Sequence, residues 1–188
     1  MRLTIILIFI STNLIAQEFR KIRVEIGFGS AFNYPGYNYP RTTALLAYFD
    51  PSYRLNSKMR IGFKMEVALG GIVIGSYGPN FQYYFFNKAF RPFVGLGIGF
   101  YHPGLPSNNS TGRGPYSTDE ETSLGFYPRL GFDYRHFALT IDYNIAATSK
   151  ALIHDNSTTP ITTFNGHLEN NYLGLKLGIF IGGGRKKN

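Results

Sequence analysis

Strict alternation of apolar and polar side chains over residues 58–70 is the feature that most constrains the fold of this chain. Every odd position from Met59 to Leu69 is apolar, whereas every even position from Lys58 to Gly70 is charged or small. Successive side chains of a β-strand point to opposite faces of the sheet. The segment therefore predicts a strand with one wholly apolar face and one polar face.

The same period of two recurs in seven further segments, each about ten residues or longer. A strand that crosses a bilayer at a tilt needs about 9–11 residues, so all of these segments are long enough to span one. The chain has 22 Gly, 16% aromatic residues and no Cys, which favours an all-β fold and excludes a disulfide scaffold or a cysteine nucleophile. The further segments are 20–32, 44–56, 77–87, 91–102, 123–134, 137–148 and 170–181.

Short and long connections alternate between these segments. Residues 56–57, 87–90 and 135–136 are expected as tight turns, whereas the longer stretches are rich in Gly, Pro, Asn, Ser and Thr. Short turns at one end and long loops at the other are typical of a membrane barrel, so the expected fold is an all-β, eight-stranded antiparallel up-and-down transmembrane β-barrel. An even number of strands places both termini at the short-turn end, which is periplasmic in such a barrel. The expected long loops are 33–43, 71–76, 103–122 and 149–169.

Residues 1–16 have the pattern of a secretory signal peptide. Arg2 supplies a positive charge, residues 3–10 form a short apolar core, and Ala16 is a small residue next to the expected cleavage site. The apolar run is too short for a membrane-spanning helix, which needs about 20 residues. We expect cleavage before Gln17, which leaves residues 17–188 as one outer-membrane barrel domain.

The distribution of charge indicates which face of each strand points inward. The apolar faces carry no Lys or Arg, and each such residue at the bilayer midplane would cost about 2–4 kcal/mol. The polar faces combine Gly with six cations and five anions, which suits a narrow lumen better than a solvated surface. A secreted lipocalin-like carrier, whose apolar face lines the interior, is the soluble alternative.

Eight strands enclose an interior just wide enough for side chains to fill it. Ions in such an interior are tolerated only when they are paired and hydrogen-bonded. We therefore expect a lumen charge network that plugs the barrel structurally, with a gated pore or proton path as the alternative. The expected members are Arg23, Glu25, Asp50, Arg54, Arg60, Lys64, Glu66, Arg129, Asp133, Asp142 and Lys176.

Most of the remaining basic residues fall at the expected short-turn end. Nine Lys and Arg residues lie there, opposed by Glu18. Basic side chains at an interface attract anionic head groups, by about 1 kcal/mol each near a charged surface. Because these cations lie at turns and form no single face, we expect no nucleic-acid partner.

Three stretches carry a family likeness: Ala16-Gln17 at the signal end, the Gly-x-Gly strand 93–99, and the closing strand 172–181. Together they resemble the eight-stranded outer-membrane β-barrel proteins of the OmpA transmembrane-domain, OmpX and OmpW kind, most of all the short secreted forms from Bacteroidota. The resemblance implies an outer membrane as the location, with outer-membrane lipid, lipopolysaccharide and the barrel-assembly machinery as partners. The tail 182–188 departs from the family pattern, because the assembly signal ends in an aromatic residue.

The chain shows little that points to chemistry. Its four His residues lack metal-ligand spacing, so we expect no zinc site, and we expect no cofactor. The acidic run Asp119, Glu120 and Glu121 is a weak candidate for a divalent cation in a loop. Some eight-stranded barrels modify lipid A with Ser and His near the outer rim, but the pairs here lack a fixed strand spacing. Those pairs are His102 with Ser107 or Ser110, and His154 with Ser157.

The sequence therefore predicts an integral outer-membrane barrel protein with no enzymatic activity. Its expected role is envelope integrity or surface interaction, with an extracellular ligand bound through the long loops. A small-solute porin and a lipid A-modifying enzyme are the two membrane-bound alternatives, besides the lipocalin-like carrier.

Overall fold

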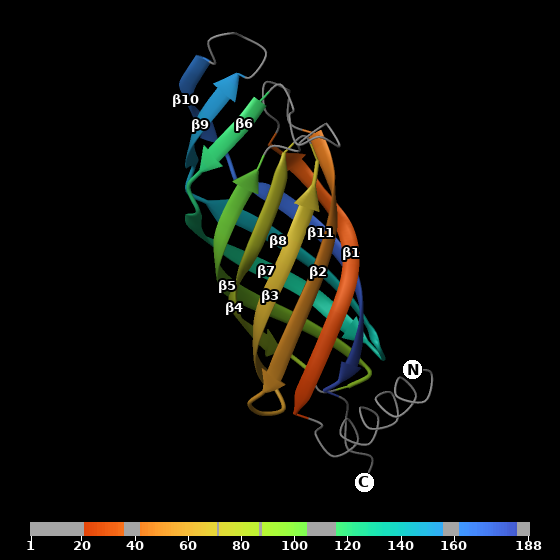
Figure 1. Ribbon diagram of the computed structural model, residues 1–188. Helices are drawn as coiled ribbons and strands as arrows, with labels where there is room; N and C mark the ends of the chain where they lie inside the picture. Colours follow the sequence, from red (N-terminus) through yellow and green to blue (C-terminus); the bar gives the residue numbers. More distant parts are fainter. Residues whose placement is uncertain are drawn as a thin grey trace, which may run out of the picture.

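Eight strands close into one antiparallel barrel in a computed structural model that describes residues 21–35, 42–70, 72–86, 88–104, 116–155 and 162–183 (Figure 1). Each strand pairs with its neighbour along the chain, and the first strand pairs with the last. This confirms the predicted fold class. The barrel strands are β1 (Ile22–Tyr34), β2 (Thr42–Arg54), β3 (Met59–Leu69), β4 (Val73–Tyr84), β5 (Phe90–Gly104), β7 (Ser123–Tyr134), β8 (Phe137–Ala146) and β11 (Tyr172–Gly182).

Three further strands form a separate sheet beyond the long-loop end of the barrel (Figure 1). They are β6 (Tyr116–Glu120), β9 (Ser149–Asp155) and β10 (Thr162–Leu168), with β9 in the middle. The prediction that 103–122 and 149–169 are loops was therefore wrong in part. Local periodicity does not reveal these strands, because β6 and β9 pair through backbone hydrogen bonds between distant parts of the chain.

The predicted loop 71–76 was also wrong, because β4 already begins at Val73. The pairs Leu69–Val73 and Ala68–Ile74 continue the ladder between β3 and β4 up to a tight connection. Glycines around this connection give the segment the composition of a loop, but the β-branched residues Val73 and Ile74 extend the strand.

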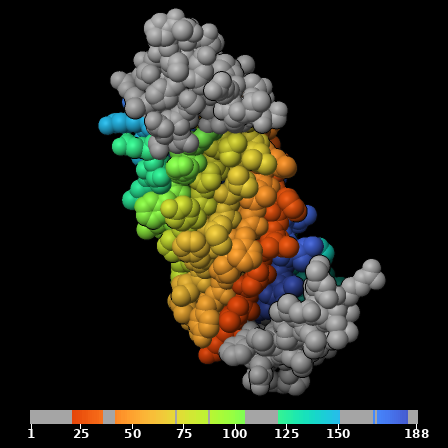
Figure 2. Space-filling model, in the orientation of Figure 1, coloured from red at the N-terminus to blue at the C-terminus, as the bar shows by residue number. Residues whose placement is uncertain are grey.

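Burial alternates along every barrel strand, and the apolar residues are the exposed ones. Leu177 in the middle of β11 is 58% exposed, whereas its neighbour Lys176 is 0% exposed. The apolar side chains thus form the outer wall, part of which Figure 2 shows as a continuous surface over β1 to β5. A soluble carrier requires the opposite arrangement, so the lipocalin-like alternative is excluded. No helix in the described ranges is long and apolar enough to cross a membrane.

A bulge near the end of β1 reverses the facing of Tyr34. The register between β1 and β2 shifts between Ala31 and Tyr34, and Asn33 has a φ of 56°. By simple alternation Tyr34 would point outward like Phe32. Instead it is fully buried, since the extra residue of a bulge turns the next side chain to the other face.

The short-turn end comprises the connections 55–58, 85–89 and 135–136, together with the start of β1 and the end of β11. In the first connection, Oδ1 of Asn56 accepts hydrogen bonds from the backbone N–H groups of Lys58 and Met59 at 2.8 and 2.9 Å. An Asn side chain that bonds the backbone in this way favours a tight turn. The predicted signal peptide 1–16 lies outside the described residues.

Candidate functional site: the filled lumen

The lumen near the long-loop end is sealed by apolar and aromatic side chains. Leu46, Ile74, Tyr101 and Tyr172 are each 0% exposed there. The ring centroids of Tyr34 and Tyr172 lie 5.6 Å apart, and the Tyr34 hydroxyl shares its proton between two backbone carbonyls at 2.9 and 3.0 Å. This layer closes the lumen with packed rings whose polar tips are hydrogen-bonded.

Below the seal, two lysines and two carboxylates form a four-membered cluster. Glu66 accepts hydrogen bonds from Lys176 at 2.6 Å, from Lys64 at 3.2 Å and from the hydroxyl of Tyr172 at 2.7 Å. Lys176 also contacts Asp142, which lies 3.6 Å from Lys64. The formal charges cancel, so this buried cluster meets the requirement that interior ions be paired.

A second ion pair crosses the lumen at the same level of the barrel. Arg129 of β7 donates to Asp50 of β2 at 2.8 Å, and Asn80 of β4 donates to the same carboxylate at 3.0 Å. All three residues are less than 5% exposed. The pair ties together strands that are not neighbours in the wall.

The third group, near the short-turn end, is centred on Arg23. Its guanidinium contacts both Glu25 and Asp133 and stacks on the ring of Phe180, with its Cζ 3.5 Å from the ring centroid. Tyr48 donates to Glu25 at 2.7 Å. Arg23 therefore forms ion pairs with both buried carboxylates near the short-turn end.

The structure places ten of the eleven predicted network members in the lumen, where they are buried. Arg54 is the exception and corrects the prediction. It is half-exposed at the end of β2, where Nε donates to the carbonyl of Asn56 at 2.9 Å and Nη2 to that of Ser57 at 3.1 Å. Because β2 ends at this residue, the side chain reaches the turn and not the middle of the lumen.

Arg91 is a lumen residue that the sequence analysis assigned to the rim. It is 9% exposed, and its Cζ lies 4.4 Å from the ring centroid of Tyr84. The alternation of β5 indicates this lumen position, since Arg91 shares the odd-numbered face of the strand with Gly95, Gly97 and Gly99. The sequence analysis placed Arg91 at the rim because it lies next to a turn.

Glycines on the lumen face of β5 and β11 make room for tyrosines. A Cβ on Gly97 would collide with the ring of Tyr127, and one on Gly178 would collide with the hydroxyl of Tyr48. Tyr48, Tyr101 and Tyr127 therefore fill the lumen, whereas Tyr134 and Tyr143 are more than 40% exposed on the outer wall.

The loop acidic residues show no assembled cation site. Asp119 and Glu120 lie in β6 opposite Leu152 and Ala151, and their side chains are outside the described part of the structure. Glu121 is exposed, and its N–H donates to the carbonyl of Lys150 at 3.0 Å. Within the described residues, no group of three or more His, Asp or Glu is arranged to hold a metal ion.

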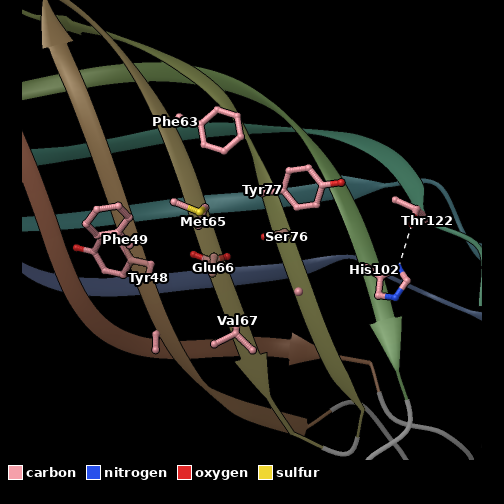
Figure 3. A pocket seen from close by; sticks show the side chains of 12 residues that line it. Tyr48, Phe49, Phe63, Met65, Glu66, Val67, Ser76, Tyr77, His102 and Thr122 are labelled. Atoms are coloured by element: carbon pink, nitrogen blue, oxygen red, sulfur yellow. Dashed lines mark hydrogen bonds between the residues drawn. The ribbon is translucent and has the colours of Figure 1, made fainter.

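The outer wall carries an apolar depression across β2 to β5, near the long-loop end (Figure 3). It is open to the outside and has a volume of about 830 Å³. Its floor consists of the smaller residues Ala47, Val67 and Gly75, which are neighbours in the register. The space above Gly75 is open, since a Cβ there would meet nothing closer than 3.9 Å. His102 stands at one edge, 3.0 Å from the hydroxyl of Thr122. The serines that we considered as partners of His102 and His154 lie outside the described residues.

Comparison with solved structures shows what this arrangement resembles. The outer membrane protein OprG from Pseudomonas aeruginosa matches with a TM-score of 0.59 and 16% identity, covering 87% of this chain and 97% of OprG. Neisserial surface protein A matches with a TM-score of 0.58 and 13% identity, covering 85% of this chain and 96% of that protein. The chain has the fold of the small eight-stranded outer-membrane β-barrels. No family model and no curated protein matches its sequence.

Proposed function

We propose that this protein is a structural barrel of an outer membrane, with a lumen closed by side chains and a loop sheet that meets extracellular partners. The observation that carries the proposal is the cluster of Lys64, Glu66, Asp142 and Lys176. Its four members are at most 5% exposed and join β3, β8 and β11 across the lumen. An ion path through the barrel would have to break these pairs.

The outer wall supports a membrane location. Its exposed apolar residues run the full length of the barrel strands, from Ile22 at one end to Phe32 at the other in β1. Soluble monomers rarely expose apolar patches of more than a few hundred Å². A bilayer is the environment in which such a wall is stable.

The ends of the barrel support an orientation. Exposed cations, among them Lys21, Lys58, Lys88 and Arg135, lie at the short-turn end. The sheet of β6, β9 and β10 extends from the other end (Figure 1). Short turns face the periplasm in bacterial barrels of this kind, so both termini are periplasmic and the sheet is extracellular.

Three experiments test the proposal. In planar bilayers, the folded chain is expected to give no steady conductance, whereas ion-selective steps would make a small-solute channel the better interpretation. A Glu66→Ala/Lys64→Ala double variant is the positive control, because it removes half of the cluster. In cells, the protein is expected in the outer-membrane fraction after an alkaline carbonate wash. Lipid A is expected to have the same mass profile with and without the gene, and a changed profile would favour an enzyme.

A further inference from the structure

Arginines at the short-turn mouth of the barrel outnumber the carboxylates that face them. Arg23, Arg60 and Arg91 are each the second residue of a strand that begins at this end, namely β1, β3 and β5. All three are buried, and the buried acids at this level are Glu25 and Asp133. Among the described residues of this level, one buried positive charge is therefore left over, and a buried charge without a counter-ion is costly.

The pairing scheme shows where the surplus lies. Asp133 stands directly opposite Arg91 in the register of β5 and β7, yet both of its oxygens bind Arg23, one of them at 3.0 Å. Arg60 has Nη1 at 3.9 Å from Asp133, beyond hydrogen-bond distance. Arg54 stands opposite Arg60 in the register of β2 and β3, so like charges face each other there.

Arg60 and Arg91 both contact the ring of Tyr84. Their Cζ atoms lie 4.9 and 4.4 Å from the ring centroid of Tyr84, and Nη1 of Arg60 donates to the Tyr84 hydroxyl at 2.7 Å. Because both guanidinium groups lie within 5 Å of the same ring centroid, two like charges are held close together. Nε and Nη2 of Arg60 and Nε of Arg91 are buried with no acceptor among the described residues.

We propose that Arg60 and Arg91 form an oxyanion-binding site at the short-turn mouth, with a phosphate group as the ligand. Two guanidinium groups offer forked N–H donors, which match phosphate oxygens in geometry and charge. A bound phosphate supplies acceptors for the orphaned N–H groups and neutralises the surplus charge.

Tyr84 and Gly183 shape this site. The Tyr84 ring holds the two guanidinium groups in place, while Gly183 follows β11 with a φ of 64° and borders Arg60. A Cβ on Gly183 would lie 3.2 Å from Nη2 of Arg60, so a side chain at this position would crowd that nitrogen. The phosphate could come from a free solute or from the head group of a phospholipid, and the test separates these sources.

The test measures thermal unfolding of the folded chain in a phosphate-free detergent at rising inorganic phosphate, with ionic strength held constant by sodium chloride. A ligand that binds the folded state raises the midpoint with the logarithm of its concentration. We expect phosphate to stabilise the wild type saturably, and Arg91→Gln to weaken that response at least tenfold. Lys88→Gln, which removes an exposed charge from the same end, is expected to respond like the wild type.

Arg91→Gln breaks no ion pair among the described residues, so it is expected to fold. Arg91→Lys is the second variant, because it keeps the charge but loses the forked donors. The same titration with soluble dihexanoyl phosphatidylglycerol identifies the source: tighter binding than inorganic phosphate indicates a lipid head group, and weaker binding a free solute. Equal stabilisation by phosphate and chloride, or an unchanged phosphate response in Arg91→Gln, would overturn the proposal. These outcomes do not depend on whether the lumen conducts, so the site and the proposed function fail separately.

Discussion

Lys176 of β11 lies 2.6 Å from Glu66 of β3, although β1 and β2 separate these strands in the barrel wall. The two residues are 110 positions apart in the chain and meet only because the sheet closes on itself. This ion pair, which fills part of the lumen, can therefore form only when the barrel has closed.

Replacing Glu66 by Gln is expected to destabilise the barrel strongly. The variant leaves Asp142 as the remaining carboxylate of the described cluster with Lys64 and Lys176, and breaking a buried ion pair costs about 3–5 kcal/mol. Urea unfolding in detergent micelles measures the loss. Glu121→Gln, at an exposed position near the long-loop end, is the matched control and is expected to change stability by less than about 0.5 kcal/mol. Equal stability of the two variants would show that Glu66 carries no such role.

Replacing Gly97 by Ala is expected to destabilise the protein by about 1–3 kcal/mol, the usual cost of overpacking a core. The added methyl group would collide with the ring of Tyr127. Gly75→Ala is the control on the adjacent strand, because the space around Gly75 is open. Denaturant midpoints of the two variants give the comparison, and a Tyr127→Leu background should relieve the cost of Gly97→Ala. The idea fails if both glycines tolerate Ala equally in the wild-type background.

Placing a charge on the outer wall tests its contact with lipid. Leu177→Arg in the middle of β11 is expected to cost about 2–4 kcal/mol in a bilayer. Leu55→Arg, at an exposed site next to the short turn, should cost about 0–1 kcal/mol because it lies near the interface. Reversible unfolding from lipid vesicles measures both values. A small cost at Leu177 would contradict burial of this wall in a membrane.

Because of the bulge in β1, the stability of the protein is expected to depend on which residue replaces Asn33. Its φ of 56° is unfavourable for most L-residues and particularly for β-branched ones. Asn33→Val is expected to cost about 1–2 kcal/mol, whereas Asn33→Gly should be nearly neutral. Thermal unfolding compares the two variants. If valine were tolerated as well as glycine, the left-handed conformation would not be needed to turn Tyr34 inward.

Much of the fold follows from local alternation. The pattern in 58–70 predicts β3 nearly to the residue, and the same reasoning finds the other seven barrel strands and the three short turns. It also identifies ten lumen charges, because the parity of a residue in a strand decides which face its side chain takes. The misassigned arginines, Arg54 and Arg91, both lie at strand ends, where the position of the last paired residue decides between lumen and turn.

The sequence by itself determined the eight barrel strands and the separation of an apolar face from a charged one, because a period of two is a local property of the chain. Only the tertiary structure decided which charges pair, that Tyr34 turns inward at a bulge, and that Arg60 and Arg91 share Tyr84. Those contacts depend on barrel closure and on register between distant segments. Neither is encoded in the spacing of neighbouring residues.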